Sequence, residues 1–176
     1  MTEFIYASHF SLQLLRLLNA CERAIVGLSL EELNDTQADT TNSIGFDVWH
    51  VVRTVDNMIH FVFEREQPVW LAQGYNDRWG LPRVDQGTGM EASTAHGLRF
   101  PEPSEFMTYI TAVTAAVVPR VAAMTDDYLR TTNRVVPWGE IPRLQAIGQV
   151  LIAHGNGHLG RCDLARTLLG KSGLAY

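Results

Sequence analysis

The sequence has little cysteine, with only Cys21 and Cys162 among its 176 residues. Two cysteines are too few for a disulfide framework, so we expect two free thiols in a reducing compartment. The sequence also has no apolar run near the roughly 18 residues that a bilayer-spanning helix needs, which excludes a membrane span. Met1, Thr2 and Glu3 lack the basic start of a signal peptide. We therefore expect a cytoplasmic protein with no membrane partner.

Positive charge is also scarce in this sequence. The 14 Lys and Arg residues are outnumbered by 19 Asp and Glu residues, which gives a formal net charge of -5 at pH 7. No basic field is available to attract a phosphate backbone, so we exclude nucleic acid as a main partner. The sequence has no internal repeat or linker-like stretch, and its hydrophobic content of 46% is enough for a sizeable core. We expect one domain over residues 1–176.

Four stretches of the sequence carry apolar residues at steps of three and four, the spacing that lines one face of an α-helix. These stretches are approximately 8–27, 43–65, 104–124 and 142–169. Pro119 lies inside the third stretch and should bend it, because proline removes one backbone hydrogen bond. A brief extended segment is expected within 131–138, and nothing else indicates a sheet. The pattern predicts an all-α fold with four main helices.

A connection of about 37 residues separates the second and third stretches, which is long for so small a domain. Trp70, Tyr75 and Trp79 lie within it and favour a loop packed onto the helices over a disordered spacer. These aromatic side chains could also wall a binding pocket. The length of the connection permits the third helix to run parallel to the second, whereas a short turn would force an antiparallel pair.

Two of the six histidines form the sharpest pattern in the sequence. His154 and His158 lie one helical turn apart inside the apolar stripe of the fourth stretch, so both rings should point toward the core. Two rings placed in this way can each bring a nitrogen within about 2.0–2.1 Å of one metal ion. Zinc sites that perform chemistry usually hold three protein ligands and leave one position for water or substrate. The pair therefore predicts part of a metal site that needs a third ligand.

His50, in the second stretch, is the best candidate for that third ligand. Its face of the helix lies roughly 120° from the centre of the aliphatic stripe, so His50 must meet the fourth helix across a flanking interface. His60 lies about 15 Å farther along the same helix and is turned away, so we interpret it as a surface or boundary residue. His9 and His96 fall near a helix start and in a loop. All three stay outside the predicted site.

Several neighbours of the histidine pair have two interpretations each. Arg161 could hold an anionic group of a substrate in a bidentate pair, or it could be a boundary arginine whose stem covers apolar surface. Cys162 could be a fourth soft ligand, but a buried structural cysteine is commoner. Gly155, Gly157 and Gly160 either let another backbone or a ligand approach the histidines or break the helix there.

Short motifs surround the three histidines. They are Ser43-Ile44-Gly45-Phe46 leading to His50, the segment from His154 to Gly160, the approach from Trp138 to Pro142, and the closing Leu168-Leu169-Gly170. With these motifs the chain resembles the DinB superfamily over nearly its whole length. The resemblance implies an all-α four-helix bundle of DinB type with a long connection between helices 2 and 3. It also implies a divalent metal ion, zinc or nickel, held by His50, His154 and His158, and a homodimer. Arg161 departs from the family pattern, which often has glutamine at that place.

The superfamily includes enzymes that act with bacillithiol, mycothiol or glutathione. The resemblance therefore implies transfer of such a low-molecular-weight thiol to an electrophilic small molecule. A metal-dependent hydrolase and a non-catalytic stress protein that binds a metal or small ligand are the alternatives. An open ligand position favours an enzyme, whereas closure of the site by Cys162 favours the non-catalytic protein.

Other catalytic arrangements find no support in the sequence. A di-iron site needs two Glu-x-x-His motifs, and its nearest approach here is the single Asp47-x-x-His50, so we reject it. The sequence also contains no Ser-His-Asp arrangement, phosphate-binding loop or nicotinamide fingerprint.

Overall fold

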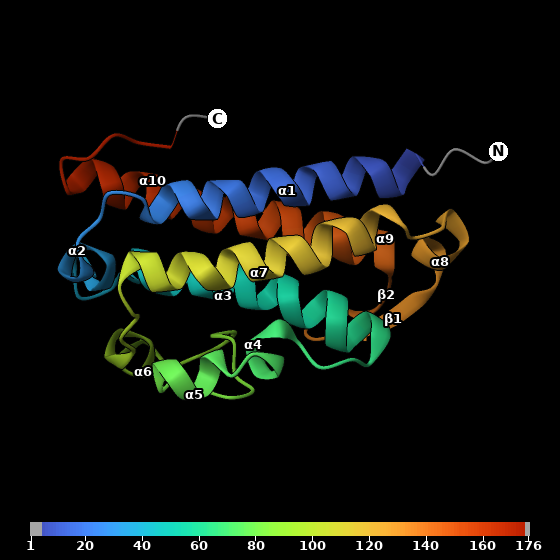
Figure 1. Ribbon diagram of the computed structural model, residues 1–176, viewed down its shortest axis with the longest axis horizontal. Helices are drawn as coiled ribbons and strands as arrows, with labels where there is room; N and C mark the ends of the chain where they lie inside the picture. The colour runs from blue at the N-terminus through green and yellow to red at the C-terminus, as the bar shows by residue number, and fades with distance from the viewer. Residues whose placement is uncertain (1–4, 175–176) are drawn as a thin grey trace.

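The computed structural model describes residues 5–174. Its body consists of four long helical rods (Figure 1). The rods are α1 (Ile5–Ile25), α3 (Ile44–Asp56) with the π-helical η1 (Asn57–Phe63), α7 (Pro103–Ala122), and α9 (Arg143–Gln145) with the π-helical η2 (Ala146–Ala153) and α10 (His154–Leu168). Each rod overlaps one predicted stretch, so the four-helix bundle is confirmed. Met1, Thr2 and Glu3, on which the expectation about a signal peptide rests, lie outside the described residues.

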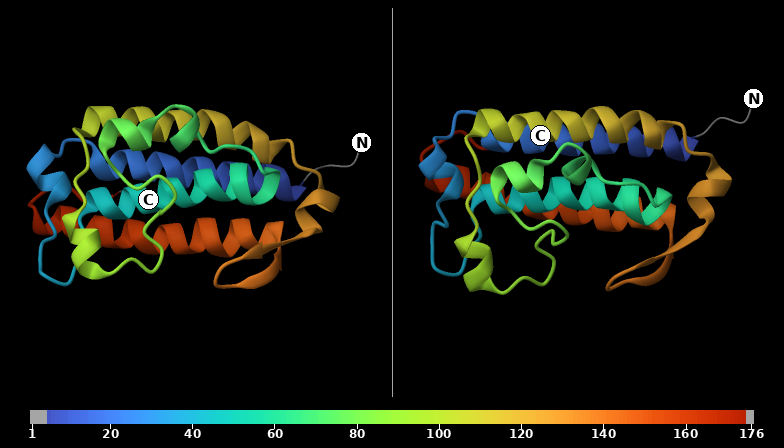
Figure 2. Two further views of the ribbon diagram at one scale, coloured as in Figure 1. Left: turned by 90° about the horizontal axis from the view of Figure 1, so that it is seen from below. Right: turned by 60° about the horizontal axis from the view of Figure 1, so that its bottom comes forward.

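The rods run in two directions. α3 and α7 begin at the same end of the bundle, whereas α1 and α10 run the opposite way (Figures 1 and 2). The parallel course of α3 and α7 is one that the long connection between them permits. α10 packs against both α3 and α1. The contact between α3 and α10 brings the first half of the chain next to the last helix.

Apolar side chains from all four rods meet in a common core. Leu18 of α1, Val55 of α3 and Val113 of α7 are 0% exposed, and Leu151 of η2 is 1% exposed. Each belongs to an apolar stripe visible in the sequence, and burying such a side chain stabilises the fold by roughly 1.5–3 kcal/mol. Among residues 5–174, no helix combines the length and the hydropathy that a bilayer crossing requires.

Glycines and proline are accommodated inside two of the rods. α10 is helical through its three glycines, so the alternative of a broken helix is wrong. A Cβ atom at Gly155 would lie 3.0 Å from the side chain of Leu17, whereas Gly157 and Gly160 have nothing within 4 Å of theirs. Gly155 therefore lets α1 and α10 approach closely. Pro119 lies within α7, which continues past it to Ala122.

The long connection before α7 packs onto the bundle. It contains α4 (Val69–Ala72), α5 (Tyr75–Trp79) and α6 (Ala92–Gly97), and its first part lies along the side formed by α3 and α7 (Figure 1). Trp70 is 0% exposed. Its ring lies 5.3 Å from that of Trp79 and 5.2 Å from that of Tyr109 in α7. The prediction of a packed loop is confirmed.

Short elements fill the remaining links of the bundle. They are α2 (Leu30–Asn34), α8 (Asp126–Arg130), β1 (Thr132–Val135) and β2 (Gly139–Pro142). The two strands pair antiparallel, with Thr132 opposite Pro142 and Val135 opposite Gly139. The extended segment predicted within 131–138 is therefore the first strand of a hairpin, whose second strand the sequence pattern did not indicate.

Candidate metal centre

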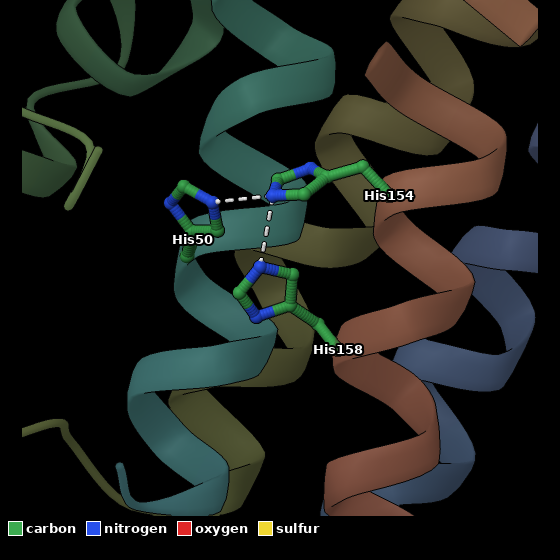
Figure 3. A group of neighbouring side chains, drawn as sticks. All are labelled: His50, His154 and His158. Atoms are coloured by element: carbon green, nitrogen blue, oxygen red, sulfur yellow. Dashed lines mark hydrogen bonds between the residues drawn. The ribbon is translucent and has the colours of Figure 1, made fainter. Parts of the chain in front are cut away.

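His50, His154 and His158 lie together where α3 meets α10 (Figure 3). Ser43 caps α3, because its hydroxyl accepts a hydrogen bond of 3.1 Å from the backbone N–H of Phe46. This start places His50 in the second turn of the helix. His154 opens α10 directly after η2, and His158 follows one turn later. The structure therefore brings together the three histidines that the sequence pattern selected.

The three rings point their Nε2 atoms toward one another. The Nε2 atom of His154 lies 3.4 Å from that of His50 and 3.0 Å from that of His158. The ligand atoms of the three residues all lie within 4.8 Å of one another. Three nitrogens of a tetrahedral zinc site, each about 2.0–2.1 Å from the ion, are about 3.3 Å apart. The spacing of these rings thus fits one metal ion.

Every Nδ1 atom in the cluster has an oxygen acceptor. His50 Nδ1 lies 2.5 Å from the carbonyl oxygen of Gln86, and His154 Nδ1 lies 3.2 Å from that of Val150. His158 Nδ1 lies 2.8 Å from Oδ1 of Asp47. With each Nδ1–H donating to an oxygen, each Nε2 presents its lone pair toward the centre of the cluster. The three rings offer these facing lone pairs no donor of their own, and among the described side chains only the Nη2 group of Arg161 reaches the lone pair of His158, from the edge of the cluster. A cation would satisfy such an arrangement.

Burial keeps two of the rings in the neutral form that binds metal. It lowers the pKa of His50 to about 4, a shift that the neighbouring His158 and His154 reinforce and the Gln86 carbonyl partly offsets. Burial and the nearby His158 also lower the pKa of His154. A lower histidine pKa means that the neutral imidazole is the form present near pH 7. The Nε2 atoms of His50 and His154 are thus available to a metal ion without displacing a proton.

Asp47 is a candidate site residue that sequence reasoning missed. Its side chain is almost fully buried, and while Oδ1 accepts the hydrogen bond from His158, Oδ2 lies 3.3 Å from Nε of Arg161. A carboxylate behind a metal-ligating histidine fixes the orientation of the ring and raises its basicity. The signal was the three-residue step from Asp47 to His50, which places both side chains on one face of the helix. That step was used only to reject a di-iron site.

Arg161 lies at the edge of the histidine cluster. Its side chain is 56% exposed, and its Nη2 atom lies 3.0 Å from Nε2 of His158. The guanidinium group therefore reaches the same space that the three Nε2 atoms face. This position suits an anchor for an anionic group better than a boundary role.

A cavity of about 290 Å³ opens next to the three rings. It is lined by Asn42, Phe46, His50, Gly87, Thr88, Gly89, Met90, Ala95, His154, His158 and Arg161. The expectation that Trp70, Tyr75 and Trp79 wall the pocket is wrong, because their rings pack against Tyr109 of α7. The wall comes instead from a later part of the same connection.

Gly87 holds that later part against His50. It has a φ of +91°, and a Cβ atom there would lie 2.8 Å from Cζ of Phe46 and 3.3 Å from Nδ1 of His50. Only glycine combines a left-handed backbone with this close approach. The carbonyl oxygen that supports His50 belongs to the preceding residue, Gln86. Gly87 therefore positions the support of a candidate ligand.

The Gly87→Ala variant is expected to bind the metal about 10–100-fold more weakly, the usual cost of disturbing a ligand's hydrogen-bond partner. Gly89→Ala is the matched control, because Gly89 also has a positive φ of 69° but nothing lies within 4 Å of its Cβ position. It should bind the metal as the unmodified protein does. Competition with a chromophoric zinc chelator measures both affinities. Equal affinities in the two variants would contradict a positioning role for Gly87.

Cys162 does not belong to the histidine cluster. The group of candidate ligand atoms among the described residues contains the three histidines without it. Cys162 and Cys21 are 1% and 0% exposed. Burial raises the pKa of Cys21 to about 12 and that of Cys162 well above its usual value. Both are therefore inert structural thiols, and no described protein ligand closes the fourth position.

The two thiols should react with a disulfide reagent such as DTNB at pH 8 about a hundredfold or more slowly in the native protein than in denaturant, because the thiolate is the reactive form. Absorbance of the released thiol measures both rates. A native thiol that reacts as fast as in the denatured chain would contradict the burial of Cys21 and Cys162.

The remaining histidines lie apart from the cluster. His60 is 4% exposed, so its interpretation as a surface or boundary residue is wrong. Its Nδ1 atom lies 2.8 Å from Oδ1 of Asp56, which is 0% exposed. The helical wheel turned His60 away from the core, but its contact with the buried Asp56 holds the ring in the interior. His9 and His96 are not part of the cluster, as expected.

Comparisons with known proteins agree with this fold. A family model described as the DinB superfamily matches residues 13–162. A search of curated proteins finds no match. A crystal structure of a conserved protein from Enterococcus faecalis is similar, with a TM-score of 0.78 and 20% sequence identity, over 97% of this chain and 99% of that chain. A likeness at this identity shows the fold alone.

Proposed function

The chain belongs to the DinB superfamily, and from that premise we propose that it is a metal-dependent enzyme that transfers a low-molecular-weight thiol to an electrophilic small molecule. His50, His154 and His158 are the proposed ligands of a divalent ion, zinc or nickel. The thiol is of the bacillithiol, mycothiol or glutathione type. A cytoplasmic location and a homodimer belong to the same proposal.

The observation that carries the proposal is the convergence of three Nε2 atoms with an open side. The nitrogens face one another at 3.0 and 3.4 Å, and a cavity of about 290 Å³ adjoins them. Sites that hold a metal through three protein groups and keep a further position open are typical of catalysis, whereas closed sites of four protein ligands are typical of structure. This arrangement supports an enzyme over a non-catalytic binding protein.

A divalent ion bound there would supply a Lewis acid that lowers the pKa of a thiol or water toward neutrality. The chain's own residues do the positioning. Asp47 and the Gln86 carbonyl hold the rings of His158 and His50 by their Nδ1–H groups. Arg161 offers a cationic fork to an anionic group of a bound molecule. In the transfer, sulfur bonds to carbon, the leaving group departs with its electron pair, and the thiol proton passes to solvent.

The choice of thiol transfer over hydrolysis rests on family membership, because both reactions use a nucleophile at the same open position. The test is a panel in which metal-loaded protein is mixed with bacillithiol, mycothiol or glutathione and with monochlorobimane as the electrophile. Formation of the fluorescent thioether measures transfer. We expect the rate with His158→Ala to fall to the uncatalysed level, while His9→Ala, which changes an exposed histidine, keeps full activity. Cleavage of an ester or amide substrate tested in parallel, without thioether formation in the panel, would replace the transferase by the hydrolase.

A further inference from the structure

A second cavity adjoins the one at the candidate metal centre. It has a volume of about 170 Å³ and is lined by Gln37, Thr40, Thr41, Asn42, Asp47, Arg161, Leu164, Ala165 and Leu168. Asn42 and Arg161 line both cavities. The two cavities therefore adjoin each other at these two side chains. Together they reach the range of about 300–1,000 Å³ that is usual for small-molecule sites. We call the second cavity the side groove.

The side groove has one apolar wall and one polar wall. Leu164 and Leu168 lie one turn apart on α10 and are 61% and 65% exposed. Exposed leucines at this spacing form an apolar strip that water covers at a cost in free energy. The opposite wall comes from the segment between α2 and α3, where Thr40 and Thr41 supply hydroxyl groups. A groove with this lining suits an elongated molecule with an apolar arm.

Arg161 lies between the two cavities and is the one arginine or lysine among the residues that line either of them. Asp47 pairs with its Nε atom at 3.3 Å. Within the described residues no other carboxylate pairs with this guanidinium group. An arginine has five N–H donors in a planar fork and binds a carboxylate through two of them. Its Nη2 atom lies 3.0 Å from Nε2 of His158, so an anion bound here would lie beside the candidate ligands.

We propose that Arg161 and the side groove select a substrate that carries a carboxylate with an apolar arm, the carboxylate on Arg161 and the arm along Leu164 and Leu168. This inference rests on the proposed function, because the reacting end of the same molecule is taken to lie at the histidine cluster. The carboxylate can come from the electrophile or from the thiol. The experiment below separates the two sources.

The experiment is calorimetric titration of zinc-loaded protein with straight-chain carboxylates of two to eight carbons and with the matching neutral amides. Each added methylene that enters the groove should tighten binding about fourfold, as expected from its transfer out of water. The carboxylates should bind at least about tenfold more tightly than the amides of the same length, because a charged pair replaces a neutral hydrogen bond. Equal affinity of carboxylates and amides would overturn the proposal.

Two kinds of variant separate the anchor from the groove. Arg161→Gln, which restores the residue common in the family, should abolish the preference for carboxylate over amide and leave the zinc content unchanged. Leu164→Ser and Leu168→Ser should flatten the dependence on chain length and leave acetate binding unchanged. Leu12→Ser is the matched control, since Leu12 is 45% exposed, lies on α1 and is not among the residues that line the groove. Retention of the full chain-length dependence in both groove variants would contradict the proposal.

Metal-stripped protein and size measurements complete the test. The preference for carboxylates should survive removal of zinc, because Arg161 and not the ion makes the contact, and its loss would place the carboxylate on the ion and overturn the proposal. If no metal binds but this preference remains, the proposed enzyme fails while the ligand class stands.

If light scattering shows that Leu164→Ser converts a dimer into a monomer, the apolar strip is a subunit interface and the proposal is wrong. Displacement of octanoate by the thiol would assign the carboxylate to the thiol, and independent binding would assign it to the electrophile.

Discussion

The His154→Ala variant is expected to lose its metal ion. Among the three rings His154 is the central one, because its Nε2 atom lies 3.4 Å from that of His50 and 3.0 Å from that of His158. Two ligands on different helices would remain, and they would lack the neighbour that joins them. We expect metal affinity to fall by at least about a hundredfold, more than the loss of a supporting residue costs. Protein of this variant purified without a tag should then contain less than about a tenth of an equivalent of metal per chain, as measured by elemental mass spectrometry.

His9→Ala provides the control for this result. His9 is exposed in α1 and lies outside the cluster, so the variant should keep the metal content of the unmodified protein. His50→Ala and His158→Ala should lose the metal as His154→Ala does, while circular dichroism shows the helical signal of the bundle in all four. Full metal content in the three cluster variants would show that the ion binds elsewhere.

The largest effect on stability is expected from Asp56→Ala. Asp56 is 0% exposed. Its oxygens accept hydrogen bonds of 2.9 Å from the backbone N–H groups of Val69 and Trp70 and of 2.9 Å from the hydroxyl of Tyr109, in addition to the His60 contact. Alanine would leave these buried donors without a partner. The free energy of unfolding should fall by about 3–5 kcal/mol, the usual cost of breaking a buried charged network.

Urea unfolding followed by circular dichroism measures this loss. The matched control is Asp127→Ala, because the Asp127 side chain is fully exposed and its pair with Arg130 is screened by water. That variant should change the free energy of unfolding by less than about 0.5 kcal/mol. A loss below about 1 kcal/mol for Asp56→Ala would contradict the role given to the buried network.

Asp56 also connects the stability of the fold to the site. It fastens the start of the long connection to α3, and the later residues Gln86 and Gly87 of that connection contact His50. Asp56, in the rod formed by α3 and η1, thus holds the long connection at one point, and His50 on the same rod contacts it at another. Loosening the connection at Asp56 should therefore weaken metal binding as well as folding.

The main features of the site could be predicted from local sequence because they follow helical periodicity. The four-residue step from His154 to His158 fixes one shared face, and α10 realises it despite three glycines. The helical wheel placed His50 on a flank of its helix, and that flank is where α3 meets α10. Spacing within a helix is a local property. Two residues four apart therefore share a face of the helix however that helix packs in the tertiary structure.

The remaining features depend on contacts between distant segments. The course of the long connection decides that Gly87, rather than Trp70, lies against His50, and no periodicity encodes that course. The burial of His60 depends on its contact with Asp56 and on the distant segment at Val69, whose backbone N–H donates to the same carboxylate. The π-helical segments η1 and η2 were not expected either. Such segments shift the angular positions that follow them, so helical-wheel arithmetic across 142–169 has no fixed period.

The most direct test of the central claim is X-ray absorption at the zinc edge of the zinc-loaded protein. Three histidines with an open position predict imidazole nitrogens at about 2.0–2.1 Å, one or two further light-atom ligands and no sulfur. The His154→Ala variant should lose the imidazole signal. A sulfur ligand at about 2.3 Å would show that a cysteine closes the site, and it would contradict the open three-histidine centre on which the proposed chemistry depends.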